Sequence, residues 1–212
     1  NIKNQKMHLP FFSKVKGSTN EVKMGIKILG DMLVANGAMI LRTTSLMACW
    51  ATVTSVATRM GTTQVGAHQV GLSVWLLLAL VSEAPSIASQ VLSARYLGKG
   101  LTKAARSIAY LTIGISATGG AVLGSALFIF RDVIPSLFTS DKALANQIKQ
   151  LIPILALQQP LVACTLVAEG LLIGAGQFNF LACTTMFNSV AGTLGVLAIG
   201  RYRPRWGVVQ LW

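Results

Sequence analysis

The sequence predicts an all-α integral membrane protein with about five transmembrane helices. Only 11% of its 212 residues are charged, whereas soluble domains carry about 25%. Its apolar runs reach the roughly 20 residues that a helix needs to cross a bilayer. The 18 Lys and Arg residues outnumber the 6 Asp and Glu residues, but they gather between the apolar runs, as topology signals do. We therefore expect a lipid bilayer, and no nucleic acid, as the partner of this basic chain.

The chain divides into a polar start, a membrane region and a basic end. Residues 1–27 form a polar, Lys-rich lead-in, and residues 201–212 form a basic tail that is too short to span. Between them, in 28–200, the expected spans lie near 28–58, 69–92, 106–130, 143–174 and 178–199. The lead-in and the loop at 93–106 are the two basic segments, so both are predicted to be cytoplasmic.

The first span, 28–58, contains two charged residues, Asp31 and Arg42. They face nearly the same way on a helix, but they lie about 16 Å apart along its axis. Arg42 is therefore the deeper ion and needs a partner on another segment. The alternative is that Arg42 extends its long side chain to the membrane interface.

The second span, 69–92, carries an acidic residue beside a proline. Glu83 is followed by Pro85, and Ser86 and Gln90 share its helical face. Pro85 leaves a backbone carbonyl unpaired, which a membrane helix tolerates where it lines a cavity. We interpret Glu83 and Gln90 as facing such a cavity, with Pro85 as a helix kink. The alternative is a Ser and Gln stripe that only joins helices.

The third span, 106–130, has no interior charge and is expected to serve packing alone. Gly120 and Gly124 are four residues apart, a spacing of small residues that lets two helix backbones approach closely. Polar segments at 59–68, 93–105 and 131–142 are expected to be the main connecting loops. Ser140 is expected to cap the helix that follows the last of them.

The fourth span belongs to the stretch 141–176, which opens polar and becomes almost wholly apolar. Pro153 and Pro160 are seven residues apart and lie on one face of the helix. Pro160 is expected to kink the helix near Gln159, and Pro153 is a second candidate kink.

A polar stripe runs along the same helix. Gln158, Thr165 and Glu169 fall at i, i+7 and i+11, which places them on one side of an otherwise apolar helix. Because an ion inside a bilayer is costly, Glu169 is interpreted as facing a protein cavity. The alternative is a kink that serves helix packing, with Glu169 near the interface.

No pattern predicts catalysis, a metal site or a disulfide framework. Cys49, Cys164 and Cys183 all fall inside apolar runs, where cysteine usually behaves as a small buried hydrophobic residue. There is no paired Cys or His spacing for a metal ion and no nucleophile or zinc-protease motif. We expect a protein that is not an enzyme and that has no cofactor.

Several short motifs, taken together, carry a resemblance to a known family. They are LRT at 41–43, AHQ at 67–69, Glu83 with Gln90, the loop at 96–98, PSLFTSD at 135–141, QQP at 158–160 and EGLLIGAG at 169–176. In order and spacing they resemble the MATE (multidrug and toxic compound extrusion) transporters, especially the DinF-like branch that includes plant plastid members.

The resemblance implies twelve helices in two six-helix lobes and export of an organic solute against an H⁺ or Na⁺ gradient. This chain would supply helices seven to eleven of the C-terminal lobe, with 1–27 as the linker from a missing N-terminal lobe. Helix twelve would be absent, and the tail at 201–212 departs from the family's usual continuation.

The same resemblance gives roles to two acids and a location to the protein. Glu169 falls where many relatives have an acid on the tenth helix, and Glu83 matches an acidic position of the eighth. The expected location is a plastid membrane, or else the plasma or vacuolar membrane.

The solute and the function have further interpretations. A basic interior residue such as Arg42 suits an anionic solute. The alternative function is a non-transporting, truncated membrane protein that acts as a partner or regulator.

Overall fold

The protein is an all-α bundle in a computed structural model that describes residues 19–202 and Trp212. Its helices are α1 (Thr19–Arg59), α2 (Thr62–Gly98), α3 (Thr102–Ile129), α4 (Ile134–Phe138), α5 (Lys142–Gly174) and α6 (Phe178–Tyr202). All except α4 are long and apolar enough to cross a membrane. The predicted fold class and the five spans are therefore confirmed, and the described residues contain no strand.

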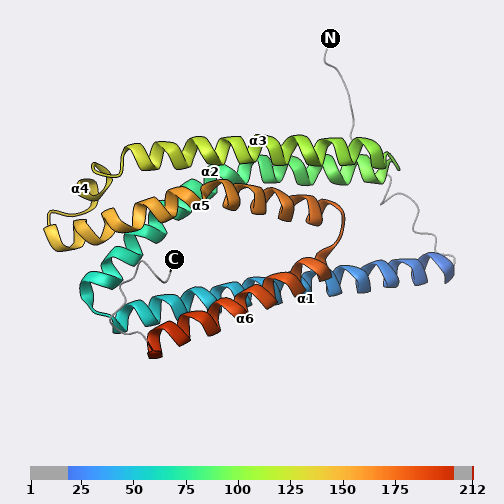
Figure 1. The fold of residues 1–212 in the computed structure, drawn as a ribbon. Helices are drawn as coiled ribbons and strands as arrows, with labels where there is room; N and C mark the ends of the chain where they lie inside the picture. The colour runs from blue at the N-terminus through green and yellow to red at the C-terminus, as the bar shows by residue number, and fades with distance from the viewer. Residues whose placement is uncertain (1–18, 203–211) are drawn as a thin grey trace, which may run out of the picture.

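The long helices form two groups. In one group α2 and α3 pack on α5, and in the other α1 packs along α6 (Figure 1). The N-terminal end of α1 and the turn between α2 and α3 lie at the same end of the molecule, as the predicted topology requires (Figure 1). Most of the lead-in, 1–18, and the tail residues 203–211 lie outside the described residues.

The connecting loops are shorter than predicted because polar residues continue the helices. The expected link at 59–68 shrinks to Met60 and Gly61, and the expected loop at 93–105 shrinks to 99–101. Each break contains a glycine with positive φ, at 119° for Gly61 and 73° for Gly100. Residues other than glycine rarely adopt a positive φ, because their Cβ atom clashes with the backbone, so glycine fits both turns.

The segment between α3 and α5, which was predicted as a loop, contains the short helix α4. An ion pair joins this segment to α5, with Nζ of Lys149 2.5 Å from Oδ1 of Asp132. The hydrogen bond from Lys149 lowers the pKa of the exposed Asp132 carboxyl below its usual value. The prediction that Ser140 caps α5 is wrong, since Asp141 accepts a hydrogen bond from the backbone of Ala143 at 2.9 Å.

The predicted glycine contact on α3 is confirmed. A Cβ atom on Gly124 would lie 2.4 Å from the carbonyl oxygen of Ala156, and one on Gly120 would lie 2.7 Å from that of Gln159. Pro160 has no backbone N–H, so it cannot satisfy the Ala156 carbonyl four residues earlier. Glycine on α3 thus lets the two backbones meet where α5 lacks a hydrogen bond.

Glycines of α5 make the equivalent contact with α2. A Cβ atom on Gly170 or Gly174 would lie 2.4 Å from the carbonyl oxygen of Ser86 or Gln90, respectively. The Ser86 hydroxyl also donates a 2.6 Å hydrogen bond across the interface to the carbonyl of Leu166. Close backbone contact and interhelical hydrogen bonds are the usual means of holding membrane helices together.

The helices continue through their prolines. No break is seen in α2 at Pro85 or in α5 at Pro153 and Pro160, although both helices are bowed along their length (Figure 1). The use of these three positions as moving kinks stays a prediction.

Candidate functional site

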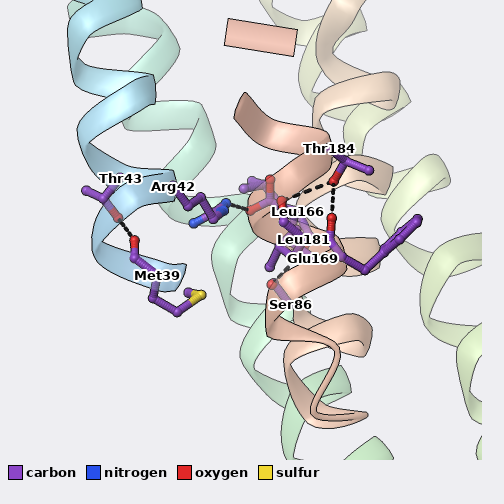
Figure 2. Close-up of polar contacts among 9 residues, drawn as sticks. Met39, Arg42, Thr43, Ser86, Leu166, Glu169, Leu181 and Thr184 are labelled. Atoms are coloured by element: carbon purple, nitrogen blue, oxygen red, sulfur yellow. Dashed lines mark hydrogen bonds and ion pairs between the residues drawn. The ribbon is translucent and has the colours of Figure 1, made fainter. Parts of the chain in front are cut away.

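The central feature of the site is an ion pair between the two helix groups. The guanidinium of Arg42 on α1 donates a hydrogen bond to the carboxylate of Glu169 on α5. Figure 2 shows Arg42 reaching across from α1 to the helix that carries Glu169. The sequence predicted that Arg42 needs a partner on another segment, and the structure supplies one 127 residues away.

Both members of the pair are largely removed from the surface. The side chains of Arg42 and Glu169 are 14% and 26% exposed. The Nε atom of Arg42 is buried and has no hydrogen-bond partner among the described residues. Removing one member of such a pair is costly because the other charge is left buried without compensation. The pair therefore links α1 to α5, and removing one of its members should be costly.

The turn of α5 that carries Glu169 is held by α2. Gly170, the next residue, lies against the backbone and hydroxyl of Ser86, and the Ser86 hydroxyl bonds to Leu166 on the same turn (Figure 2). The carboxylate thus projects from a fixed base on the α2 and α5 side. Arg42 approaches it from α1, which has few neighbours besides α6.

The remaining predicted polar residues are dispersed. Thr165 is exposed, and its hydroxyl donates to the Leu161 carbonyl of its own helix at 2.8 Å. Glu83 is exposed on α2, and Gln90 is half-buried, with its carbonyl facing Gly174. The structure does not bring Glu83, Gln90 or Thr165 into contact with the ion pair, so their roles in a cavity stay predictions.

A separate cavity of about 360 Å³ lies between α1, α2, α5 and α6. Gln158, which the sequence placed in a cavity, lines it. The amide nitrogen Nε2 of Gln158 is buried and has no partner among the described residues. Most of the other walls are apolar or aromatic. The predicted stripe on α5 therefore separates into Gln158 at this cavity and Glu169 at the ion pair.

The sequence patterns did not point to the polar and aromatic residues that line this cavity beside Gln158. His68 is only 3% exposed and lies 3.2 Å from the Thr54 hydroxyl. Trp50 and Trp75 meet edge to face, with ring centroids 5.3 Å apart. Aromatic residues in apolar spans are usually core residues, so their type alone gave no signal. The AHQ motif at 67–69 was the available pointer to His68.

The described residues form an all-helical fold with five helices that are long and apolar enough to cross a membrane. Buried ion pairs within membrane-length helices are typical of transport proteins, and so are helices that contain proline. The chain belongs to the MatE family, whose family model matches residues 38–196. It is thus an integral membrane protein, and the expectation that it is not an enzyme agrees with this membership.

Several curated proteins are similar to this chain. Protein DETOXIFICATION 44, chloroplastic, of Arabidopsis thaliana is 30% identical over 180 residues, which cover 85% of this chain and 34% of that protein. Protein DETOXIFICATION 45, chloroplastic, of the same plant is 27% identical over 77% of this chain and 29% of its own length. The probable multidrug resistance protein NorM of Listeria monocytogenes is 31% identical over 65% of this chain and 29% of its own length.

A solved structure has the same fold. A MOP superfamily transporter from Pyrococcus furiosus matches with a TM-score of 0.76 at 14% identity, over 85% of this chain and 40% of that chain. The described helices therefore have the fold of a part of that longer chain. The chain spans about a third of the length of the curated relatives, such as 34% of DETOXIFICATION 44.

Proposed function

We propose that this chain forms part of an antiporter that exports an organic solute in exchange for protons, with Glu169 as the coupling group. The observation that carries the proposal is the Arg42–Glu169 ion pair, which links the two helix groups. The names of the relatives, which speak of detoxification and multidrug resistance, agree with export. They do not favour the alternative of a non-transporting partner.

Protonation would act directly on this link. A proton on the Glu169 carboxylate removes its negative charge, so the attraction to the Arg42 guanidinium is lost. Arg42 then needs another partner, such as a solute acceptor, water or the missing lobe. Because α1 packs mainly on α6, these two helices would move away from α5 as a pair. Ion binding would thus be converted into a change of access.

A proton is a better coupling ion here than Na⁺. Na⁺ would have to bind a carboxylate that already lies against a guanidinium, whose positive charge repels it. Sodium also needs several oxygen ligands, whereas a proton needs a single carboxylate oxygen. No group of three His, Cys, Asp or Glu residues that could hold a metal ion occurs in the described part of the chain.

The proposal is tested with the full-length parent protein in vesicles. Glu169→Gln keeps the size of the side chain but removes its charge, so proton-driven export is expected to fall at least tenfold. Glu83→Gln on the exposed face of α2 is expected to have a smaller effect. Thr118→Val should leave export unchanged, because that exposed hydroxyl on α3 donates to carbonyls of its own helix. Export by Glu169→Gln at the wild-type rate would contradict the proposal. Export driven by Na⁺ at constant pH would overturn the choice of ion.

The names of the same relatives support a proposal for the location. DETOXIFICATION 44 and 45 are both named chloroplastic, so we propose a plastid membrane for the full-length parent. A fluorescent fusion of the parent found only in the plasma or vacuolar membrane would contradict this location.

A further inference from the structure

The cavity between α1, α2, α5 and α6 is distinct from the Arg42–Glu169 pair and has a different chemistry. Its volume of about 360 Å³ falls in the range of small-molecule sites. Among the described residues, 19–202 and Trp212, no Asp, Glu, Lys or Arg lines it. Trp50 and Trp75 form an aromatic corner, and the polar groups come from Thr54, His68 and Gln158. The walls suit an uncharged planar ring.

A chain of hydrogen bonds defines what His68 can offer a ligand. The Thr54 hydroxyl donates to the carbonyl of Trp50 at 3.0 Å, so toward His68 it can only accept. The Nε2 atom of His68, 3.2 Å from that hydroxyl, must therefore carry the proton. In a neutral imidazole the other nitrogen, Nδ1, is then an acceptor. His68 thus presents an acceptor to a group that donates.

The chain's own Trp212 already acts as such a donor. Its indole N–H donates to His68 Nδ1 at 3.2 Å, and the two ring centroids are 5.6 Å apart. Trp212 is the described residue beyond Tyr202, and it lines the cavity. The cavity therefore accommodates an indole ring, whose N–H points to Nδ1 of His68.

Gln158 supplies the complementary group. Its amide Nε2 is buried without a partner among the described residues, and a buried donor left unpaired carries an energetic cost. A ligand with an acceptor oxygen would satisfy it. The cavity therefore offers an acceptor at His68, which Trp212 now uses, and an unpaired donor at Gln158.

We propose that this cavity is a binding site for a neutral, planar heteroaromatic solute of about indole size, which donates an N–H to His68 and accepts from Gln158. The inference rests on the proposed function, since it names the class of solute that the exporter takes. It departs from the anionic solute that Arg42 suggested, because Arg42 is already paired with Glu169. Trp212 occupies part of the same site and competes with the solute.

The test uses Cys49, which lines the cavity. In the full chain in detergent, with Cys164→Ser and Cys183→Ser, the rate of Cys49 alkylation by N-ethylmaleimide is measured against probe concentration. The probes are indole-3-carboxamide, indole, and 1-methylindole, which has no N–H. Circular dichroism of each variant checks that it is folded.

The expected result is graded protection. Indole should protect Cys49 at a concentration about tenfold lower than 1-methylindole, which loses one hydrogen bond, and indole-3-carboxamide should protect best. His68→Phe should abolish the difference between indole and 1-methylindole. Trp212→Ala should lower the protecting concentration by about threefold or more, because it frees the site. Equal protection by indole and 1-methylindole in the unaltered cavity would overturn the proposal.

This assay needs no ion gradient, so its outcome is separate from that of the export assay. Failure of protection while export by the parent still depends on Glu169 would overturn the solute site alone. Protection that persists while export is independent of Glu169 would support the site and overturn the proposed coupling.

Discussion

The two helix groups are held together in different ways. In the group of α2, α3 and α5, backbones touch through glycines, and the side chains of Leu151 and Leu155 on α5 are fully or almost fully buried. In the group of α1 and α6, α1 packs along α6 and has few other neighbours, and large apolar side chains of α1 such as Leu33 and Ile40 are exposed. The first group is a packed unit, whereas the second lies against it.

The difference places the polar chemistry at the boundary between the groups. The Arg42–Glu169 pair joins α1 to α5, and the bond of Thr54 to His68 joins α1 to α2. Apolar contacts also cross this boundary, such as that of Trp50 on α1 with Trp75 on α2. Its ion pair can be altered by one proton, whereas a contact between glycine and a helix backbone cannot. This asymmetry is why we assign movement to α1 and α6 and a fixed base to α2, α3 and α5.

The largest expected effect comes from breaking the boundary at one charge. Arg42→Leu should destabilise the protein by about 3 kcal/mol, the low end for a buried pair, because Glu169 retains 26% exposure. Thermal unfolding in detergent measures it. The double variant Arg42→Leu with Glu169→Leu should recover most of the loss, since no charge remains unpaired. A double variant as unstable as the single would show that the pair does not set the stability.

The next effect sharpens the account of the packed group. Gly120→Ala should destabilise by about 1–3 kcal/mol, because the new methyl group would meet the backbone of α5. Gly119→Ala is the matched control, since a Cβ atom there has nothing within 4 Å, and it should be neutral or slightly stabilising. Equal melting temperatures for the two variants would argue against the close contact.

A smaller effect is expected at the second polar link of the boundary. Thr54→Val removes the hydroxyl that accepts from His68 and should cost about 1 kcal/mol. Thr43→Val is the control, because that exposed hydroxyl donates to the Met39 carbonyl of its own helix. Chemical unfolding of both variants distinguishes them, and an equal effect would contradict the role of the link.

The smallest effect lies outside both groups, at Asp132. The hydrogen bond from Lys149 lowers the pKa of this carboxyl from 3.8, so its stabilising contribution is present above that pH and is lost as the pH falls through the lowered value. Because Asp132 is exposed, Asp132→Asn should change the melting temperature at pH 7 by less than about 2 °C. The difference in melting temperature between variant and wild type should shrink as the pH falls. A difference that grows on acidification would contradict the account of Asp132.

The sequence predicted the fold far better than the helix ends. The thickness of a bilayer sets the length of an apolar run, so all five long helices were placed by composition. Polar residues beyond the bilayer still form helix, so composition did not show that α1 begins at Thr19 or that α2 begins at Thr62. Ser140 and Asp141 are both good caps, and only the local geometry selected Asp141.

The site was predicted in part. The cost of a buried ion predicted that Arg42 needs a partner, but the choice of Glu169 depends on how α1 lies against α5, which no local pattern contains. The helical spacing placed Gln158 and Glu169 on one stripe, whereas in the structure Gln158 lines the cavity and Glu169 pairs with Arg42. The residue types of His68 and Trp50 do not distinguish a cavity wall from helix packing, so their place at the cavity was visible only in three dimensions.

The central claim is that neutralising Glu169 separates α1 from α5 while the packed group stays fixed. It is tested by spin-label distances in a chain whose three cysteines are replaced by serine. One pair of labels is placed at the exposed positions Ile40 on α1 and Leu161 on α5, and the control pair at Val122 on α3 and Leu157 on α5.

Double electron–electron resonance then gives the distance between the labels of each pair, both in the chain with Glu169 and in Glu169→Gln at the same pH. The account predicts that the distance between positions 40 and 161 lengthens in Glu169→Gln, whereas the distance between 122 and 157 is unchanged. An unchanged distance between 40 and 161, or equal changes in both pairs, would contradict it.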